Sequence, residues 1–167
     1  MRFPRRTAHL PDDARAALHL ARGERVLSAA RQRDGEWVAA TDQGLVGAGW
    51  RAEWSAATHA QWYDDASTLA FAWLDDEGGR HERSLVLDEP GLLPETVHER
   101  VTATILLSQH LAVSGRQGVR VVARRQPGSD EVQWQVVPDA GIDAADPQVS
   151  DRVALLMRAM ATELGLR

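Results

Sequence analysis

Apolar and polar residues alternate in short runs between residues 24 and 87, and small polar residues separate these runs. Alternation of this kind is typical of antiparallel strands that tight turns join into a meander. The pair Asp34-Gly35, for example, favours a two-residue hairpin turn. We expect six strands in this stretch, at residues 25–30, 36–41, 45–50, 54–63, 69–74 and 81–87.

Helical spacing of the apolar residues predicts three helices outside this meander. The first covers residues 10–22, where two acidic residues follow Pro11 and suit the first turn of a helix. The second begins at Pro94 and covers residues 94–113. The third covers residues 147–164, and Asp146 is placed to cap its N-terminus.

Residues 118–137 alternate more strictly than any other part of the chain and predict a hairpin. Together with the meander and the helices, they indicate an α+β fold. We expect a bent, mainly antiparallel sheet or a barrel of about 7–8 strands, with N-terminal, central and C-terminal helices. The length of 167 residues fits a single domain over residues 1–167.

Composition narrows the classes of function. All 19 basic residues are arginine, and 24 acidic residues give a net charge of -5, so we expect no nucleic-acid partner. The chain contains no cysteine, which excludes disulfides and thiolate chemistry and fits a reducing cytoplasm. Its apolar runs are far shorter than the roughly 20 residues of a transmembrane helix. We therefore expect a cytoplasmic protein without a transmembrane segment.

Residues 23–74 contain GERVLSAA, GEWVAATDQGLV, WSAATHAQWYDD and TLAFAWL. Their Thr-Asp turn and tryptophan spacing resemble the small pleckstrin-homology-like (PH-like) domains of bacteria, and proteins of high-GC bacteria with the same pattern. The resemblance implies a strongly bent, seven-stranded sheet that one C-terminal helix caps. It implies no activity, because such domains bind lipids, peptides or proteins. The chain departs from that pattern, since we expect only six strands before the long helix, and a hairpin and another helix after it.

Catalytic and metal-binding motifs are missing from the sequence, so we expect no catalytic residue, metal ion or cofactor. His98 and His110 fall on the predicted second helix about 120° apart, which prevents them from sharing a metal ion. The carboxylates at residues 64–65 and 75–77 fall in predicted turns, where aspartate bonds the nearby backbone.

Two groups of residues are candidates for binding. Arg120 and Arg124 share one face of a predicted strand, where arginine could hold a phosphate or carboxylate. The members of this first group are Arg116, Arg120, Arg124, Arg125, Gln133 and Gln135. The second group is Trp50, Trp54 and Trp62, which form a protein-contact platform if they are exposed and part of the core if they are buried.

These observations favour a non-catalytic binding or scaffold module that contacts another protein or a second copy of the chain. The alternative is a protein that binds a small anionic or phosphorylated ligand on its arginine-bearing sheet face. The third hypothesis, an enzyme such as a small hydrolase, has less support, because no pattern in the sequence identifies a nucleophile or a paired acid and base.

Overall fold

The computed structural model describes residues 9–167. Its contacts divide the chain into two compact units, one up to Thr102 and the other from Ala103 to the end. The α+β class and the antiparallel pairing expected from the sequence are confirmed, although the described residues form ten strands in three sheets rather than about eight in one. The single domain expected from the sequence stays a prediction.

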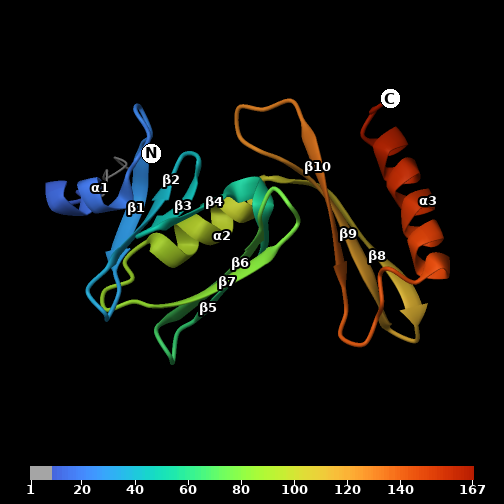
Figure 1. Cartoon of the computed structure of the whole chain (residues 1–167), viewed down its shortest axis with the longest axis horizontal. Coiled ribbons are helices and arrows are strands. Elements are labelled where there is room, and N and C mark those ends of the chain that lie inside the picture. Colours follow the sequence, from blue (N-terminus) through green and yellow to red (C-terminus); the bar gives the residue numbers. More distant parts are fainter. Residues whose placement is uncertain (1–8) are drawn as a thin grey trace, which may run out of the picture. The chain divides into compact units, whose positions relative to one another are not determined.

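The first unit contains two antiparallel sheets (Figure 1). The four-stranded sheet contains β1 (Val26–Arg31), β2 (Trp37–Thr41), β3 (Gly44–Gly47) and β4 (Trp50–Glu53) in sequence order. The three-stranded sheet contains β5 (Ala57–Tyr63), β6 (Thr68–Leu74) and β7 (Arg80–Val86). A single 3-10 turn, Trp54–Ala56, connects the two sheets.

The two sheets of this unit do not close into a barrel. In the described residues, one bridge outside the named strands joins Gln32, after β1, to Leu87, after β7. Within the described chain, β4 and β5 therefore each have one edge that no strand covers. An uncovered edge presents backbone N–H and C=O groups to whatever lies beside it.

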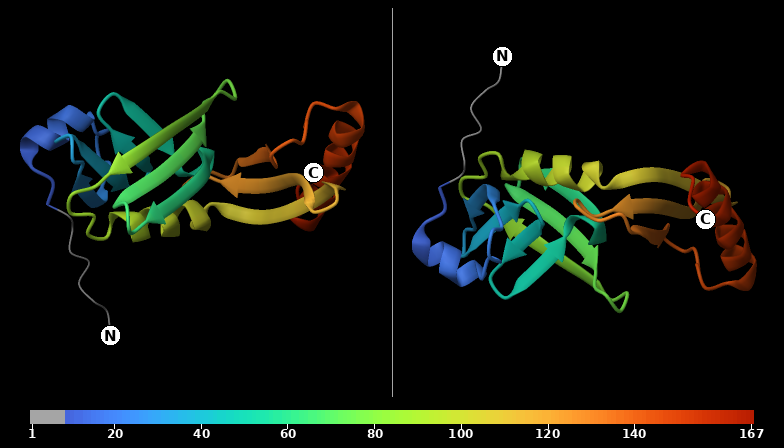
Figure 2. Two further views of the ribbon diagram at one scale, coloured as in Figure 1. Left: turned by 90° about the horizontal axis from the view of Figure 1, so that it is seen from below. Right: turned by 90° about the horizontal axis from the view of Figure 1, so that it is seen from above.

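Helices cover both sides of the first unit. Helix α1 (Asp12–Leu18) packs Ala14 and Leu18 against outward-facing residues of β1–β3. Helix α2 (Leu93–Ala103) packs Leu93, Val97 and Val101 into the core between the sheets. Figure 2 shows α2 beside the green strands β5–β7. Its three buried residues recur every fourth position, as expected of one helix face.

Between residue 9 and α2 the structure has seven strands, not the six expected from the sequence. The predicted strand 45–50 is divided by a turn at residues 48–49, where Gly49 has a φ of 74° that favours glycine. Gly47 faces the indole of Trp50, and an added Cβ would collide with that ring. An apolar run with two small residues concealed a hairpin because periodicity alone does not mark a turn of this kind.

The predicted helix 94–113 is wrong in its second half. Helix α2 ends at Ala103, and residues Ile105–Ser114 form strand β8. The apolar residues of this segment fit both a helical stripe and a strand alternation, and pairing with β9 decides between them. Because His110 lies on β8, its predicted placement on one helix with His98 is also wrong.

The second unit is a three-stranded antiparallel sheet with one covering helix (Figure 1). Its strands are β8, β9 (Gln117–Arg125) and β10 (Val132–Pro138), with β9 in the centre. The hairpin expected at residues 118–137 corresponds to β9 and β10. Its third strand is β8, whose residues were expected to be helical. Helix α3 (Pro147–Glu163) packs Val149, Val153 and Met160 against Val119 and Val121.

Candidate functional site

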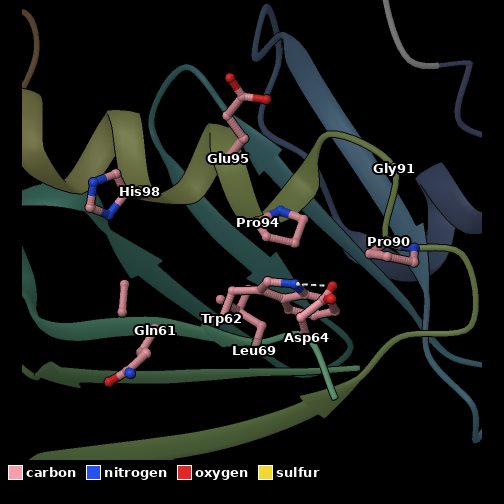
Figure 3. Close-up of a pocket in the computed structure, with 10 residues that line it drawn as sticks. Gln61, Trp62, Asp64, Leu69, Pro90, Gly91, Pro94, Glu95 and His98 are labelled. Atoms are coloured by element: carbon pink, nitrogen blue, oxygen red, sulfur yellow. Dashed lines mark hydrogen bonds between the residues drawn. The ribbon is translucent and has the colours of Figure 1, made fainter. Parts of the chain in front are cut away.

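A groove lies between strand β5 and the start of helix α2, within the first unit (Figure 3). It has a volume of about 570 Å³. The residues that line it are Ala60, Gln61, Trp62, Asp64, Leu69, Pro90, Gly91, Pro94, Glu95 and His98. In Figure 3, Glu95 and His98 lie on the helix side, opposite Trp62 and Leu69 on the strand side.

The groove lies beside β5, which is an edge strand of its sheet in the described residues. Ala60, Gln61 and Trp62 are consecutive in this strand, and all three line the groove. On its other side, β5 is hydrogen-bonded to β6, where Trp62 pairs with Leu69.

Apolar groups form the floor of this groove. Trp62 is half-buried, and Leu69 is 1% exposed. The indole Nε1 of Trp62 donates to Oδ1 of Asp64 at 3.3 Å, which holds the ring in place. Pro90 and Pro94 line the opposite side, and Pro94 lies in the first turn of α2, where proline is well tolerated.

Acidic side chains stand on the rim. Asp64 follows the end of β5, and Glu95 lies in the first turn of α2, and both are exposed. A negative rim around an apolar floor favours a ligand that combines apolar and basic groups. The sequence did not identify this groove, because its lining comes from β5 and from the start of α2, two segments that are separated along the chain.

The structure separates the three tryptophans of the predicted contact platform. Trp54 is fully buried, and its Nε1 donates to the carbonyl oxygen of Thr41 at 3.0 Å. Trp50 stacks on Trp73, with ring centroids 5.2 Å apart. Only Trp62 lines the groove. The three residues therefore have separate positions and do not form one platform.

A second aromatic cluster surrounds Trp73. The ring of His81 stacks on Trp73 at 5.2 Å, and the guanidinium carbon of Arg83 lies 5.7 Å from the rings of both Trp50 and Trp73. Nε2 of His81 is also 2.8 Å from Oδ2 of Asp75, and this hydrogen bond lowers the pKa of the Asp75 carboxyl. Since its own members occupy these ring faces, this cluster joins strands rather than offering an open aromatic surface.

The predicted arginine face lies in the second unit, and the structure divides its members. Arg116 in the β8–β9 turn, Arg120 and Gln133 are exposed, whereas Arg124 and Gln135 are each 4% exposed. Arg125, the last member, is half-buried. The cross-strand pairs Arg124–Gln133 and Val122–Gln135 place Arg120, Arg124 and the two glutamines on one face of this sheet, whereas Arg125 pairs with Val132 on the other face.

Arg124 is held by groups of the protein itself. Its Nε donates to Oε1 of Gln135 at 2.9 Å, and its Nη1 donates to Oγ1 of Thr104 at 2.8 Å. Burial lowers the pKa of Arg124 to about 10. Because this guanidinium already holds the start of β8 against β10, it has a structural use and is not displayed for a ligand.

Arg120 has polar neighbours on the same face. Its Nη1 is 3.5 Å from Oγ of Ser108, at the limit of a hydrogen bond. His110 pairs with Arg120 across the strands, and its Nε2 is 2.9 Å from Oδ2 of Asp139. Hydrogen bonds from His110 and from the backbone N–H of Gly118 lower the pKa of Asp139, and Arg120 adds to this effect. The carboxylate of Asp139 would repel an anion approaching Arg120.

The first unit holds one buried ion pair that the sequence did not reveal. Both carboxylate oxygens of Glu24, which is 5% exposed, accept from Arg51 at 2.8 Å. Thr41 and the backbone N–H of Ala21 also donate to this carboxylate. Burial alone would raise the pKa of Glu24, but these hydrogen bonds lower it to about 2. The pair fixes the start of β1 to β4.

Residues 9–167 contain no cluster of three or more metal-ligating side chains, and none of their helices is long and apolar enough to cross a membrane. Comparison with known proteins finds no matching family model, no similar curated protein and no similar solved structure.

Proposed function

We propose that the chain is a non-catalytic protein-binding module whose groove between β5 and α2 receives an extended segment of a partner protein. The observation that carries this proposal is the groove of about 570 Å³ beside β5, a strand with one edge that no described strand covers. An extended segment can add a strand to such an edge. Backbone hydrogen bonds then supply affinity, and the side-chain pockets supply specificity.

The order of elements supports a PH-like first unit. A four-stranded sheet, a three-stranded sheet and then a helix follow one another along the chain. Seven strands capped by a helix are what the resemblance over residues 23–74 implies, and the seventh strand removes one of the two departures noted from the sequence.

We further propose the cytoplasm as the compartment of this protein, which suits a chain without cysteine.

The composition of the groove defines the partner segment. Trp62 and Leu69 offer an apolar floor for one side chain of that segment. Asp64 and Glu95 on the rim favour arginine or lysine beside it. We therefore expect a segment in which apolar and basic residues alternate, since alternate side chains of a strand point to the same face.

Selection from a random peptide library displayed on phage tests this proposal. Selected peptides should combine an apolar residue with basic neighbours. Trp62→Ala should weaken the binding of a selected peptide by about 30-fold, since a central tryptophan contributes about 2 kcal/mol or more to an interface. Titration calorimetry with a synthetic copy of the selected peptide measures this loss.

The matched control is Tyr63→Ala. Tyr63 is the next residue of β5 and is 43% exposed, but it does not line the groove. This variant should bind the peptide as tightly as the original chain. Selection of no peptide, or equal losses for Trp62→Ala and Tyr63→Ala, would contradict the proposal.

The anionic-ligand alternative has less support than the groove. Of its six residues, Arg124 and Gln135 are buried and bonded to each other, and Asp139 lies close to Arg120. A hydrolase also has less support, because the rim carboxylates Asp64 and Glu95 are both exposed. A catalytic acid needs a desolvated pocket that raises its pKa.

A further inference from the structure

Among the described residues, β8 is the longest strand, and only β9 pairs with it. It contains ten residues and forms one edge of the second unit's sheet. The register is regular from Ser108 to Ala112, so the backbone groups of alternate residues point in opposite directions across this stretch.

The hydrogen bonds of Gly118 show which backbone groups of β8 face outward. Gly118 pairs with Ala112, but its own N–H and C=O bond to Asp139, on the β10 side. Ala112 must then direct its N–H and C=O away from β9. By the same alternation, so do His110 and Ser108. One of these groups already has a partner, because Nη2 of Arg152 donates to the carbonyl oxygen of Ala112 at 2.8 Å.

The edge of β8 also lacks the residues that normally protect a strand edge. Its sequence, ILLSQHLAVS, contains no lysine, arginine, aspartate, glutamate or proline. The opposite edge strand, β10, ends in Pro138, whose missing N–H falls on the outward side. The edge strand β4 of the first unit contains Arg51 and Glu53. The regular stretch of this edge, from Ser108 to Ala112, is therefore a site for pairing with another strand.

Hydrophobic side chains beside this edge are incompletely covered. Leu107, Leu111 and Val113 of β8 are half-buried where they pack towards α3. On α3 itself, Leu155 is 62% exposed. More hydrophobic residues of the second unit's core cluster are half-buried than buried, so a partner at this edge would complete a core that one helix covers only in part.

We infer that β8 pairs antiparallel with β8 of a second copy of the chain, so that two three-stranded sheets become one sheet of six strands. A two-fold axis places a strand antiparallel to its own copy, and both copies then use the same surface. An uncharged strand meets no like charges across such an axis. Backbone pairing alone covers less than the roughly 1,200–2,000 Å² of a stable interface, so the half-buried side chains must also take part.

Sedimentation velocity of the full chain, over about a hundredfold range of concentration, tests this inference. The original chain should sediment as a dimer that dissociates on dilution. Ser108→Lys should produce a monomer with an unchanged circular dichroism spectrum, because it adds charge to an exposed position of the edge strand. The matched control, Gln133→Lys, adds the same charge on an exposed position of β10 and should remain a dimer.

Disulfide trapping supplies a second measurement that does not depend on destabilising the protein. The chain has no cysteine, so single cysteines can be introduced along β8 without background. Oxidation should link the two copies best at one position, and the yield should fall on both sides of it, as expected of a strand paired with itself. A monomer at every concentration, a dimer that still forms with Ser108→Lys, or no cross-linking from any cysteine along β8 would overturn the inference.

Discussion

Trp54→Ala should lower the free energy of unfolding by about 4 kcal/mol, the largest effect that we expect from a single substitution in this chain. Trp54 is 0% exposed and lies in the turn that connects the two sheets of the first unit. Its removal leaves a cavity between them and also leaves the carbonyl oxygen of Thr41 without its bond from the indole. Urea unfolding followed by circular dichroism measures the loss.

The control for this prediction is Leu92→Ala. Leu92 is 65% exposed, so its truncation should change the free energy of unfolding by less than about 0.5 kcal/mol. If Trp54→Ala costs no more than Leu92→Ala, then Trp54 does not occupy the position between the sheets that the structure gives it.

Glu24→Gln should cost about 3 kcal/mol of stability, because it removes one member of a buried ion pair and leaves Arg51 without its carboxylate. The loss should lie at the low end of the range for buried pairs, since the side chain of Arg51 is 36% exposed. Asp42→Asn provides the control. Asp42 pairs with Arg25, whose side chain is 71% exposed, and exposed pairs contribute at most about 1 kcal/mol.

The Glu24–Arg51 pair also predicts that the free energy of unfolding depends on pH. The pKa of Glu24 lies at about 2 in the folded chain, below its ordinary value of 4.5, so folding favours the ionised carboxyl. This contribution, on the order of 3 kcal/mol, is present in full above pH 4.5 and is lost as the pH falls towards 2. The unfolding free energy of Glu24→Gln should therefore fall less steeply over this range. Equal slopes for the two proteins would contradict the ion pair.

The sequence predicted the fold well where local signals decide it. Alternation marked the strands of the meander, and Asp146 caps α3 by accepting from the backbone N–H of Gln148, as its place before Pro147 suggested. The prediction failed at β8 because the same apolar residues fit either period. Pairing with β9, which follows β8 after the turn at residues 115–116, determines the outcome.

The candidate site was less predictable than the fold, because it depends on which side chains meet in space. Trp50, Trp54 and Trp62 are close in sequence, and their grouping in the prediction rests on that nearness. In the structure, Trp50 stacks on Trp73, Trp54 is bonded to Thr41 in the core, and Trp62 lines the groove. The alternation of Arg120 and Arg124 was predicted on one face, yet burial of Arg124 follows from its neighbours in the folded sheet. The groove combines β5 with the segment before α2, a pairing that no short motif encodes.

Hydrogen exchange of the full chain with a selected peptide bound is the most direct test of the proposed function. If the peptide adds a strand to β5, the amides of Ala57–Tyr63 that face outward should exchange more slowly in the complex. Amides on the other free edge strand of the unit, β4, should be unchanged. Protection at β4 or in the second unit, with none along β5, would contradict the central claim that this groove binds an extended partner segment.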